Sequence, residues 1–298
     1  MRNHHFKSLY NADYCSTTTG NNQVLYDSCT EHEFSSAKVP LTTNTLHSFS
    51  RCTFTEIHST EDGGAISFSN ADPGILTISQ CKFDHCSGTA SDDNGYGGGA
   101  IYTNKISETS VELSTFLYCS CHSGNGLTGG DGGAITINGS ITQPLISKCD
   151  FLFCNADDDG GSAAIWYSNS DSNIFICSEC RFLKGTAGDS AGGIILYSCS
   201  GRGILNCLFN RDVGDYGGAI YLYYTSYPSG MYLAQFCFFN KNWVSSSGYG
   251  TDAAIQTYFQ VTNNTILFKD CFSTSSSHRI GYYYNSWTTT NADWLYID

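Results

Sequence analysis

Apolar residues in this chain come in short alternating runs separated by segments rich in glycine, serine, aspartate and asparagine. The most regular run is Cys-x-Phe. Residues two apart on a β-strand face the same way, so each cysteine and phenylalanine is predicted to enter a core while the residue between them points out. The copies are Cys52/Phe54, Cys81/Phe83, Cys149/Phe151, Cys180/Phe182, Cys207/Phe209 and Cys237/Phe239, with Ser114/Phe116 and Cys271-Phe272 as variants.

A second motif, Gly-Gly-Ala-Ile, recurs in register with the first. It begins at Gly63, Gly98, Gly132 and Gly217, and the variants are Ser162-Ala163-Ala164-Ile165, Gly192-Gly193-Ile194-Ile195 and Asp252-Ala253-Ala254-Ile255. The successive isoleucines are 35, 34, 30, 30, 25 and 35 residues apart. A period of this size is typical of a solenoid, in which each repeat buries its apolar face against its neighbours.

Each repeat divides into two segments of different chemistry. Between the motif isoleucine and the next phenylalanine, short runs such as Ile75-Leu76-Thr77-Ile78 predict two strands joined by a bend. Between the phenylalanine and the next motif, stretches such as Ser87 to Gly97 and Ser123 to Gly130 predict a loop that absorbs all length variation. This pattern indicates a parallel β-helix. The chain shows no sustained helical stripe, and its units of 25–35 residues are short for a propeller blade.

The motifs predict one all-β domain over residues 1–298. Residues 1–48 lack both motifs and are expected to hold a degenerate coil and an N-terminal cap, residues 49–272 the repeats, and residues 273–298 a C-terminal cap. Caps are expected because an uncovered terminal coil exposes sheet edges. The aromatic run Tyr282-Tyr283-Tyr284, with Trp287 and Trp294, is predicted to cover the second end.

Charge and hydropathy narrow the classes of partner. A net charge of −13 argues against nucleic acid and anionic membranes, because both attract basic surfaces. No apolar run approaches the length of about 18 residues that a membrane span needs, so membrane insertion is not expected. The segment Met1 to Asn11 is polar and does not resemble a signal peptide.

The 15 cysteines are predicted to be reduced thiols that fill the core. At least six share the Cys-x-Phe slot, and Cys86, Cys119 and Cys154 each follow a motif phenylalanine by three residues. Equivalent residues on stacked coils have Cβ atoms about 5 Å apart, wider than the mean of about 3.8 Å in a disulfide. A ladder of thiols is therefore favoured over a disulfide framework.

The paired motifs Gly-Gly-Ala-Ile and Phe-x-x-Asn resemble the repeats of the polymorphic membrane proteins, which are right-handed β-helix adhesins within the pectin-lyase-like superfamily. Phe239 to Asn242 matches the second motif in full, whereas Phe83, Phe116 and Phe151 have cysteine in the last slot. The resemblance covers roughly residues 50–272. It implies a right-handed parallel β-helix of about seven to nine coils, a cell-surface or secreted location, and a role in adhesion.

An acidic residue precedes most Gly-Gly-Ala-Ile copies: Asp62, Asp93, Asp131, Asp159, Asp189, Asp215 and Asp252. If these corners stack, a column of carboxylates along one edge offers the oxygen ligands that Ca²⁺ prefers. The offsets vary, however, and the chain lacks the glycine-rich repeat of calcium-binding β-rolls. We therefore favour solvated turn residues and predict no metal site.

Enzymatic chemistry has little support in the sequence. The outward column between Cys and Phe offers Lys82, Asp150 and Arg181, and the last two, on adjacent coils, are predicted to form a surface ion pair. Cys177-x-x-Cys180 has no partner pair at the spacing of a structural zinc site. No catalytic, cofactor-binding or metal-binding residue is predicted, and no cofactor is expected.

The outer surface is the remaining candidate for function. Tyrosines crowd one repeat at Tyr221, Tyr223, Tyr224, Tyr227 and Tyr232, and at least one of them must point outward. We predict a non-enzymatic scaffold that binds a protein or glycan ligand through its loops and outer face. The alternative is a polysaccharide lyase or hydrolase of pectin-lyase-like fold, whose groove would collect several charged side chains.

Overall fold

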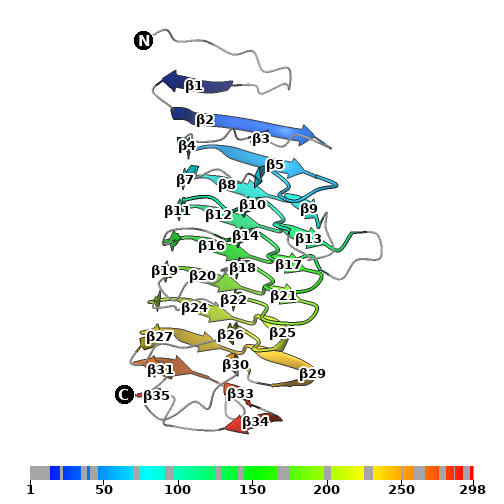
Figure 1. The fold of residues 1–298 in the computed structure, drawn as a ribbon, viewed down its shortest axis with the longest axis vertical. Coiled ribbons are helices and arrows are strands. Elements are labelled where there is room, and N and C mark those ends of the chain that lie inside the picture. The colour runs from blue at the N-terminus through cyan, green and yellow to red at the C-terminus, as the bar shows by residue number, and fades with distance from the viewer. Residues whose placement is uncertain are drawn as a thin grey trace.

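The computed structural model of the chain is a parallel β-solenoid that contains no helix in its described residues (Figure 1). The described residues are 14–20, 23–34, 39–40, 46–69, 74–90, 97–124, 129–139, 144–166, 175–197, 203–224, 231–249, 251–257, 266–274, 280–284, 286–290 and 296–297. Successive coils stack along one axis, with the N-terminal strands at one end and the C-terminal strands at the other. No described helix is long and apolar enough to cross a membrane. The all-β parallel solenoid predicted from the repeats is confirmed.

Sheet A is built from two rows of parallel strands. The first row contains β4 (Leu46–Ser50), β7 (Ile75–Ser79), β11 (Glu108–Glu112), β15 (Leu145–Ser147), β19 (Ile176–Ser178), β23 (Ile204–Leu205), β27 (Met231–Gln235), β31 (Ile266–Lys269) and β35 (Tyr296–Ile297). The second row contains β5 (Thr53–Ile57), β8 (Lys82–Asp84), β12 (Thr115–Leu117), β16 (Asp150–Leu152), β20 (Arg181–Leu183), β24 (Leu208–Asn210), β28 (Phe238–Asn240) and β32 (Phe272–Ser273). A short bend links the two rows within each coil.

Sheets C and B complete the coil. Sheet C contains β9 (Ser87–Thr89), β13 (Ser120–His122), β17 (Asn155–Ala156), β21 (Thr186–Ala187), β25 (Val213–Tyr216) and β29 (Trp243–Tyr249). Sheet B contains β3 (Val39–Pro40), β6 (Ile66–Ser69), β10 (Ile101–Asn104), β14 (Ile135–Asn138), β18 (Ala163–Trp166), β22 (Ile194–Tyr197), β26 (Ile220–Tyr224), β30 (Ala253–Thr257), β33 (Ile280–Tyr284) and β34 (Ser286–Thr290). The chain thus runs from sheet B through both rows of sheet A to sheet C and back.

The segment after each phenylalanine was predicted to be a loop, and this is wrong at its start. Ser87–Thr89 forms β9, and its counterparts build sheet C. The polar residues there still pair because neighbouring coils supply every backbone partner. Length variation is also not confined to one corner: β10 ends at Asn104 and β11 begins at Glu108, whereas β18 ends at Trp166 and β19 begins at Ile176. The connections from sheet B to sheet A vary as well.

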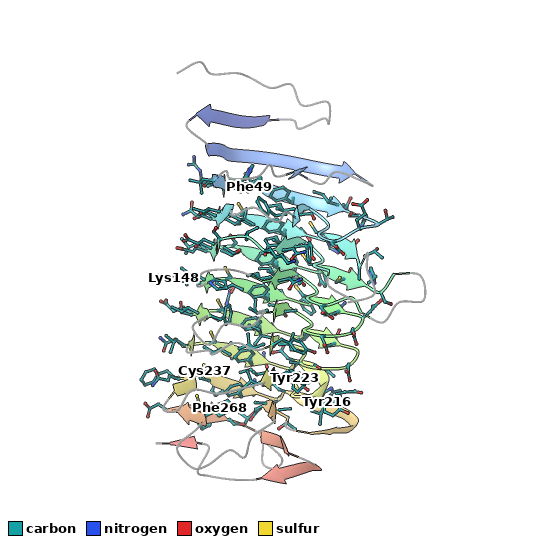
Figure 2. All side chains as sticks on the ribbon, in the orientation of Figure 1. Phe49, Lys148, Tyr216, Tyr223, Cys237 and Phe268 are labelled. Carbon is teal, nitrogen blue, oxygen red and sulfur yellow. The ribbon has the colours of Figure 1, made fainter. Side chains whose placement is uncertain are left out.

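The Cys-x-Phe copies lie in the predicted register. Phe54, Phe83, Phe116, Phe151, Phe182, Phe209 and Phe239 stack along the core with ring centroids 4.7–5.2 Å apart and planes within 6° of parallel. Figure 2 shows side chains filling the solenoid along its length, with the buried Phe49 and Phe268 toward its two ends. Lys82 and Arg181, between the paired residues, are exposed. The last copy differs: Ser273 pairs with Phe239 while Phe272 pairs with Phe238, so the ring of Phe272 lies outside.

The register of the three variant Gly-Gly-Ala-Ile copies is not the predicted one. Ile135 pairs with Ala163 rather than Ile165, and Ile220 pairs with Ile194 and Ala253. Ile194, and not Ile195, pairs with the motif isoleucine Ile220, so the register differs from the predicted one by one residue and each of the two side chains faces the side opposite to the predicted one. Ile194 packs in the main core, whereas Ile195 belongs to a second cluster on the outer face of sheet B.

The two motif glycines have different structural roles. Gly63 adopts φ +73°, in the left-handed region that glycine reaches most easily. A Cβ atom on Gly99 would lie 1.9 Å from the carbonyl oxygen of Gly133 and 2.5 Å from that of Ser120. The second glycine therefore permits a close approach of three backbones where the coils stack.

Antiparallel pairs occur near both ends of the solenoid. β1 (Tyr14–Gly20) pairs antiparallel with β2 (Gln23–Phe34), and β2 pairs parallel with both β4 and β5. At the other end β34 pairs antiparallel with β33. The side chains of Tyr282-Tyr283-Tyr284, Trp287 and Trp294 lie outside the described residues, so their predicted covering role stays a prediction.

Candidate functional site: an aromatic and cationic edge

Two columns of bends hold side chains on the outside of the solenoid. The second column, between sheet A and sheet C, consists of the residues two positions after each motif phenylalanine. All of them have φ between 52° and 61°, and they are Glu56, His85, Tyr118, Phe153, Lys184, Arg211 and Lys241. Each left-handed residue turns the chain through a corner, and its side chain projects away from the core.

Backbone hydrogen bonds fix the spacing of this second bend column. The N–H of Tyr118 donates to the carbonyl of Leu152, and the N–H of Phe153 donates to the carbonyl of Leu183, each at 2.9 Å. Lys184 and Arg211 repeat the pattern toward the next coil, again at 2.9 Å. The bend residues are therefore held at the inter-strand repeat of about 4.8 Å.

The middle of the column is a ladder of aromatic rings, exposed at His85 and Tyr118 and half-buried at Phe153. The rings of His85 and Tyr118 have centroids 4.8 Å apart, and those of Tyr118 and Phe153 are 4.9 Å apart. Tyr118 is 45% exposed. Lys184 continues the ladder, with its Nζ atom 4.8 Å from the centre of the Phe153 ring. The ring of His85 is tilted by 33° against Tyr118, whereas Tyr118 and Phe153 stack, so the ladder presents a column of ring edges with a charged end at Lys184.

Three cations and a tryptophan form the rest of the edge. Lys184, Arg211 and Lys241 lie on consecutive coils and line an open groove of about 550 Å³ together with Thr186, Val213 and Trp243. No ion pair engages these three cations within the described part of the chain. Trp243 is 62% exposed. On a protein of net charge −13, this is a local concentration of positive charge.

A second exposed aromatic patch lies on sheet A near the C-terminal end. The rings of Phe238 and Phe272 stack with centroids 5.2 Å apart, and Phe236 beside them is 56% exposed. Phe236 belongs to the first bend column, between the two rows of sheet A. This patch provides an internal comparison for the aromatic and cationic edge.

The outward column of sheet A forms local ion pairs. Arg181 binds both carboxylate oxygens of Asp150 on the adjacent coil, as predicted. Lys82 pairs instead with Asp84 at 2.7 Å. The three residues that were weighed for catalysis therefore do not converge on one point, because Lys82 lies two coils away from the Asp150–Arg181 pair.

The acidic corner is more buried than predicted. Asp131, Asp159 and Asp252 are at most 6% exposed, so their interpretation as solvated turn residues is wrong. Carboxylate oxygens of Asp131, Asp158 and Asp159 lie within 4.8 Å of one another. Burial, followed by the charges of Asp159, Asp189 and Asp157, raises the pKa of Asp158 to about 6. Asp93 lies outside the described residues.

Tyrosines from sheet B supply partners to this corner. The hydroxyl of Tyr197 donates to Asp159 Oδ2 at 2.5 Å, and the N–H of Ser190 donates to Asp159 Oδ1 at 3.1 Å. Tyr221 and Tyr223 both face outward and pack in the second apolar cluster, with Tyr221 only 6% exposed. These two tyrosines therefore pack against sheet B and do not offer a free binding surface.

Where cysteine or asparagine fills the slot three residues after the motif phenylalanine, that residue makes one common hydrogen bond. The thiols of Cys86, Cys119 and Cys154 donate to the phenylalanine carbonyl of the preceding coil at 3.6–3.7 Å. Asn242 makes the same bond to the Phe209 carbonyl at 3.3 Å and accepts from the N–H of Asp212. Cysteine thus replaces the asparagine of Phe-x-x-Asn as a buried donor.

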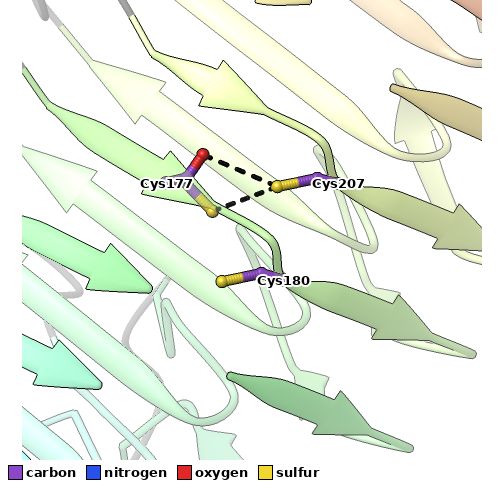
Figure 3. A group of neighbouring side chains, drawn as sticks. All are labelled: Cys177, Cys180 and Cys207. Atoms are coloured by element: carbon purple, nitrogen blue, oxygen red, sulfur yellow. Dashed lines mark hydrogen bonds between the residues drawn. The ribbon is translucent and has the colours of Figure 1, made fainter. Parts of the chain in front are cut away.

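Every cysteine whose side chain the structure describes is a free thiol, and all of these except the half-buried Cys271 are buried. Burial raises the pKa of Cys119 well above its usual value, because a thiolate there would be poorly solvated. The Sγ atoms of Cys177, Cys180 and Cys207 lie within 4.8 Å of one another (Figure 3). Sequence spacing had left Cys177-x-x-Cys180 without a partner, and the next coil supplies a third thiol.

The aromatic and cationic edge was missed from the sequence, although a signal was present. Its members all lie two residues after a motif phenylalanine, whereas the predicted pattern rests on the cysteine two residues before it. The offset of two is a bend position, where variable residues are normally read as solvated. Only the stacking of coils shows that aromatic residues and cations each occupy consecutive positions.

Comparisons with known proteins identify no relative of this chain. No protein-family model, curated protein or solved structure matches it. The resemblance to the polymorphic membrane proteins therefore stays a prediction drawn from the two repeat motifs.

Proposed function

We propose that this protein is a non-enzymatic recognition scaffold that binds an elongated anionic glycan along the aromatic and cationic edge. The observation that carries the proposal is the unbroken column of Tyr118, Phe153, Lys184, Arg211 and Lys241 at the second bend. A solenoid holds such a column straight, so a linear ligand engages several coils at once.

The chemistry of the column favours this class of ligand. Aromatic rings such as Tyr118 and Phe153, whose faces stack on each other, turn their edges outward and provide rigid apolar contact area for sugar rings. The guanidinium group of Arg211 and the ammonium groups of Lys184 and Lys241 bind carboxylates or sulfates through charge-assisted hydrogen bonds. The negative charge of the remaining surface disfavours polyanions elsewhere, so binding is restricted to this edge.

The groove supports binding more than hydrolysis. Hydrolysis of a glycosidic bond normally requires two carboxyl groups on either side of the scissile bond. The described residues that line the groove include cations, a tryptophan, a threonine and a valine, and none of them has a carboxyl group. A polysaccharide lyase or hydrolase remains the second hypothesis from the sequence.

A panel of purified glycans tests the proposal. Isothermal titration calorimetry would compare a sulfated polysaccharide, a uronic acid homopolymer and a neutral glucan against the wild-type chain and the triple variant K184E/R211E/K241E. Each charge-assisted contact contributes about 1.5–3 kcal/mol, so the triple variant should lose more than about 100-fold in affinity for the acidic glycans.

A matched control separates this edge from overall charge. K82E/K105E/K148E changes the net charge by the same amount at three exposed cations outside the groove. It should bind within a few-fold of wild type, since it leaves the edge intact. Equal losses in the two triple variants, preference for the neutral glucan, or absence of binding to either acidic glycan would contradict the proposal.

The finer family assignment belongs to the same proposal. We infer that the coils wind right-handed, because about 98% of crossover connections between parallel strands do so. A right-handed β-helix with glycine-rich and Phe-x-x-Asn-type repeats supports kinship with the adhesin family named above. If neither acidic glycan binds in the calorimetric panel, a protein becomes the alternative ligand for the same edge.

A further inference from the structure

We propose that Cys177, Cys180 and Cys207 form a buried site for one cuprous ion. The site is independent of the glycan-binding edge. Two of the thiols belong to the regular cysteine column at the first bend, and the third is an addition that other described coils lack.

The position of Cys177 is what creates the cluster. It lies in the middle of β19 and faces inward, where the preceding coil has Ile146 and the following coil has Ile204. An aliphatic side chain at this position would complete an ordinary core. A thiol here instead lies between Cys180 of its own coil and Cys207 of the next one.

The bend between the rows of sheet A aims the sulfur atoms at one another. Glu179 adopts φ +55°, which turns the chain between Cys177 and Cys180 so that both side chains enter the same space. In Figure 3 the side chains of Cys180 and Cys207 extend in the same direction from equivalent bends of adjacent coils, and the side chain of Cys177 extends toward them. The residues are at most 2% exposed, so water does not compete for the site.

The spacing of the sulfur atoms fits a three-coordinate metal. The Sγ atoms of Cys177 and Cys207 are 3.8 Å apart, and all three lie within 4.8 Å of one another. Metal–sulfur bonds of about 2.3 Å in a trigonal plane place the sulfurs about 4.0 Å apart. A disulfide would instead require about 2.05 Å between two of them.

The donor set selects the metal. Thiolates are soft ligands that favour Cu(I), zinc and iron–sulfur clusters. Structural zinc is bound by four ligands, and no fourth cysteine, histidine or carboxylate among the described residues joins this group. The backbone N–H of Cys149 donates to Cys180 Sγ at 3.5 Å, which is the kind of second-shell contact that supports a bound thiolate. Each ligand releases its S–H proton to solvent as Cu⁺ binds.

The regular column provides the control. Cys237 occupies the same bend on the coil after Cys207, is equally buried, and is not part of the three-thiol group. Its substitution by serine should preserve the site. Cys177→Val is the decisive change, because the neighbouring coils hold isoleucine at that position and the fold accommodates an aliphatic residue there.

Anaerobic refolding of the full chain with Cu(I) in the presence of a competing chromophoric chelator tests the site. Wild type and C237S should each retain one Cu(I) per chain, with three sulfur neighbours by X-ray absorption spectroscopy. C177V should lose about 100-fold or more in affinity while its circular dichroism stays that of a folded chain.

Several results would overturn the assignment. They are loss of all Cu(I) from wild type to the chelator, equal retention by C177V, equal loss in C237S, and a four-sulfur zinc site that forms in preference to Cu(I). Alkylation and mass spectrometry of the refolded protein would also overturn it if Cys177 and Cys207 were joined by a disulfide. Glycan binding by C177V should be unchanged, so failure here is distinguishable from failure of the proposed function.

Discussion

Truncation of Phe116 to alanine should destabilise the solenoid more than any exposed aromatic substitution. The Phe116 side chain is fully buried, and its ring lies 4.8 Å from Phe83 and 4.9 Å from Phe151. Burial of about 200 Å² at about 25 cal/mol per Å² contributes about 5 kcal/mol, of which the alanine methyl group retains a part. Each stacked pair adds about 0.5–1.5 kcal/mol, so we expect a loss of about 4–5 kcal/mol, at the upper end for Phe→Ala.

Urea unfolding monitored by circular dichroism measures this loss, with Phe272→Ala as the control. Phe272 is 60% exposed and has Phe238 as its stacked neighbour, so its truncation should change the free energy of unfolding by about 1 kcal/mol or less. Because coils interact mainly with their neighbours, hydrogen exchange should quicken most in β8, β12 and β16. A Phe116→Ala loss below about 1 kcal/mol, or equal to that of Phe272→Ala, would refute the stacked core.

Three further substitutions test other parts of the structure. Asn242→Ala should lower the free energy of unfolding in urea by about 1–3 kcal/mol, because the N–H of Asp212 loses its acceptor. Asn242→Cys should retain a bond to the Phe209 carbonyl, as Cys86 bonds the Phe54 carbonyl of the preceding coil. Equal losses in the two variants would contradict this role. The pKa of Asp158 is raised from 3.8 to about 6, so the wild type should lose stability as pH rises between these values. Asp158→Asn should therefore be more stable than the wild type at pH 7 and equally stable below pH 3.8. A difference in stability that does not depend on pH would contradict this. Gly99→Ala should prevent folding or lower the thermal midpoint strongly, since its Cβ would meet the Gly133 carbonyl oxygen at 1.9 Å, and an unchanged midpoint would disprove the close approach.

The sequence was sufficient for the architecture where its periodicity was strong. Phe83 and Phe116 are predicted to stack although Cys81 lies two residues before the first and Ser114 two residues before the second. The prediction is correct because the phenylalanine ring dominates the packing. The register predicted for the variant copies was wrong for a physical reason. Ile194 and Ile195 are both apolar, and alternation alone cannot distinguish the core face from an outer face that is also covered. Burial of Asp159 was likewise hidden, since its partners Tyr197 and Ser190 come from the following coil.

Functional candidates depended on contacts between coils that a linear pattern does not display. Lys184, Arg211 and Lys241 are separated by about thirty residues each and become neighbours only through stacking. Cys207 completes the thiol cluster from a different repeat than Cys177 and Cys180. A search at every fixed offset from the motif phenylalanine would have found the cationic column, whereas the thiol cluster also required the bend geometry at Glu179.

Hydroxyl-radical footprinting of the chain with and without a bound acidic glycan tests the central claim most directly. The exposed rings of Tyr118 and Trp243 and the half-buried ring of Phe153 should be protected from oxidation, because the ligand is proposed to lie across them. Phe236 and Phe272, on the separate patch of sheet A, should oxidise at unchanged rates. Protection of Phe236 and Phe272 with Tyr118 and Trp243 unaffected would contradict the account.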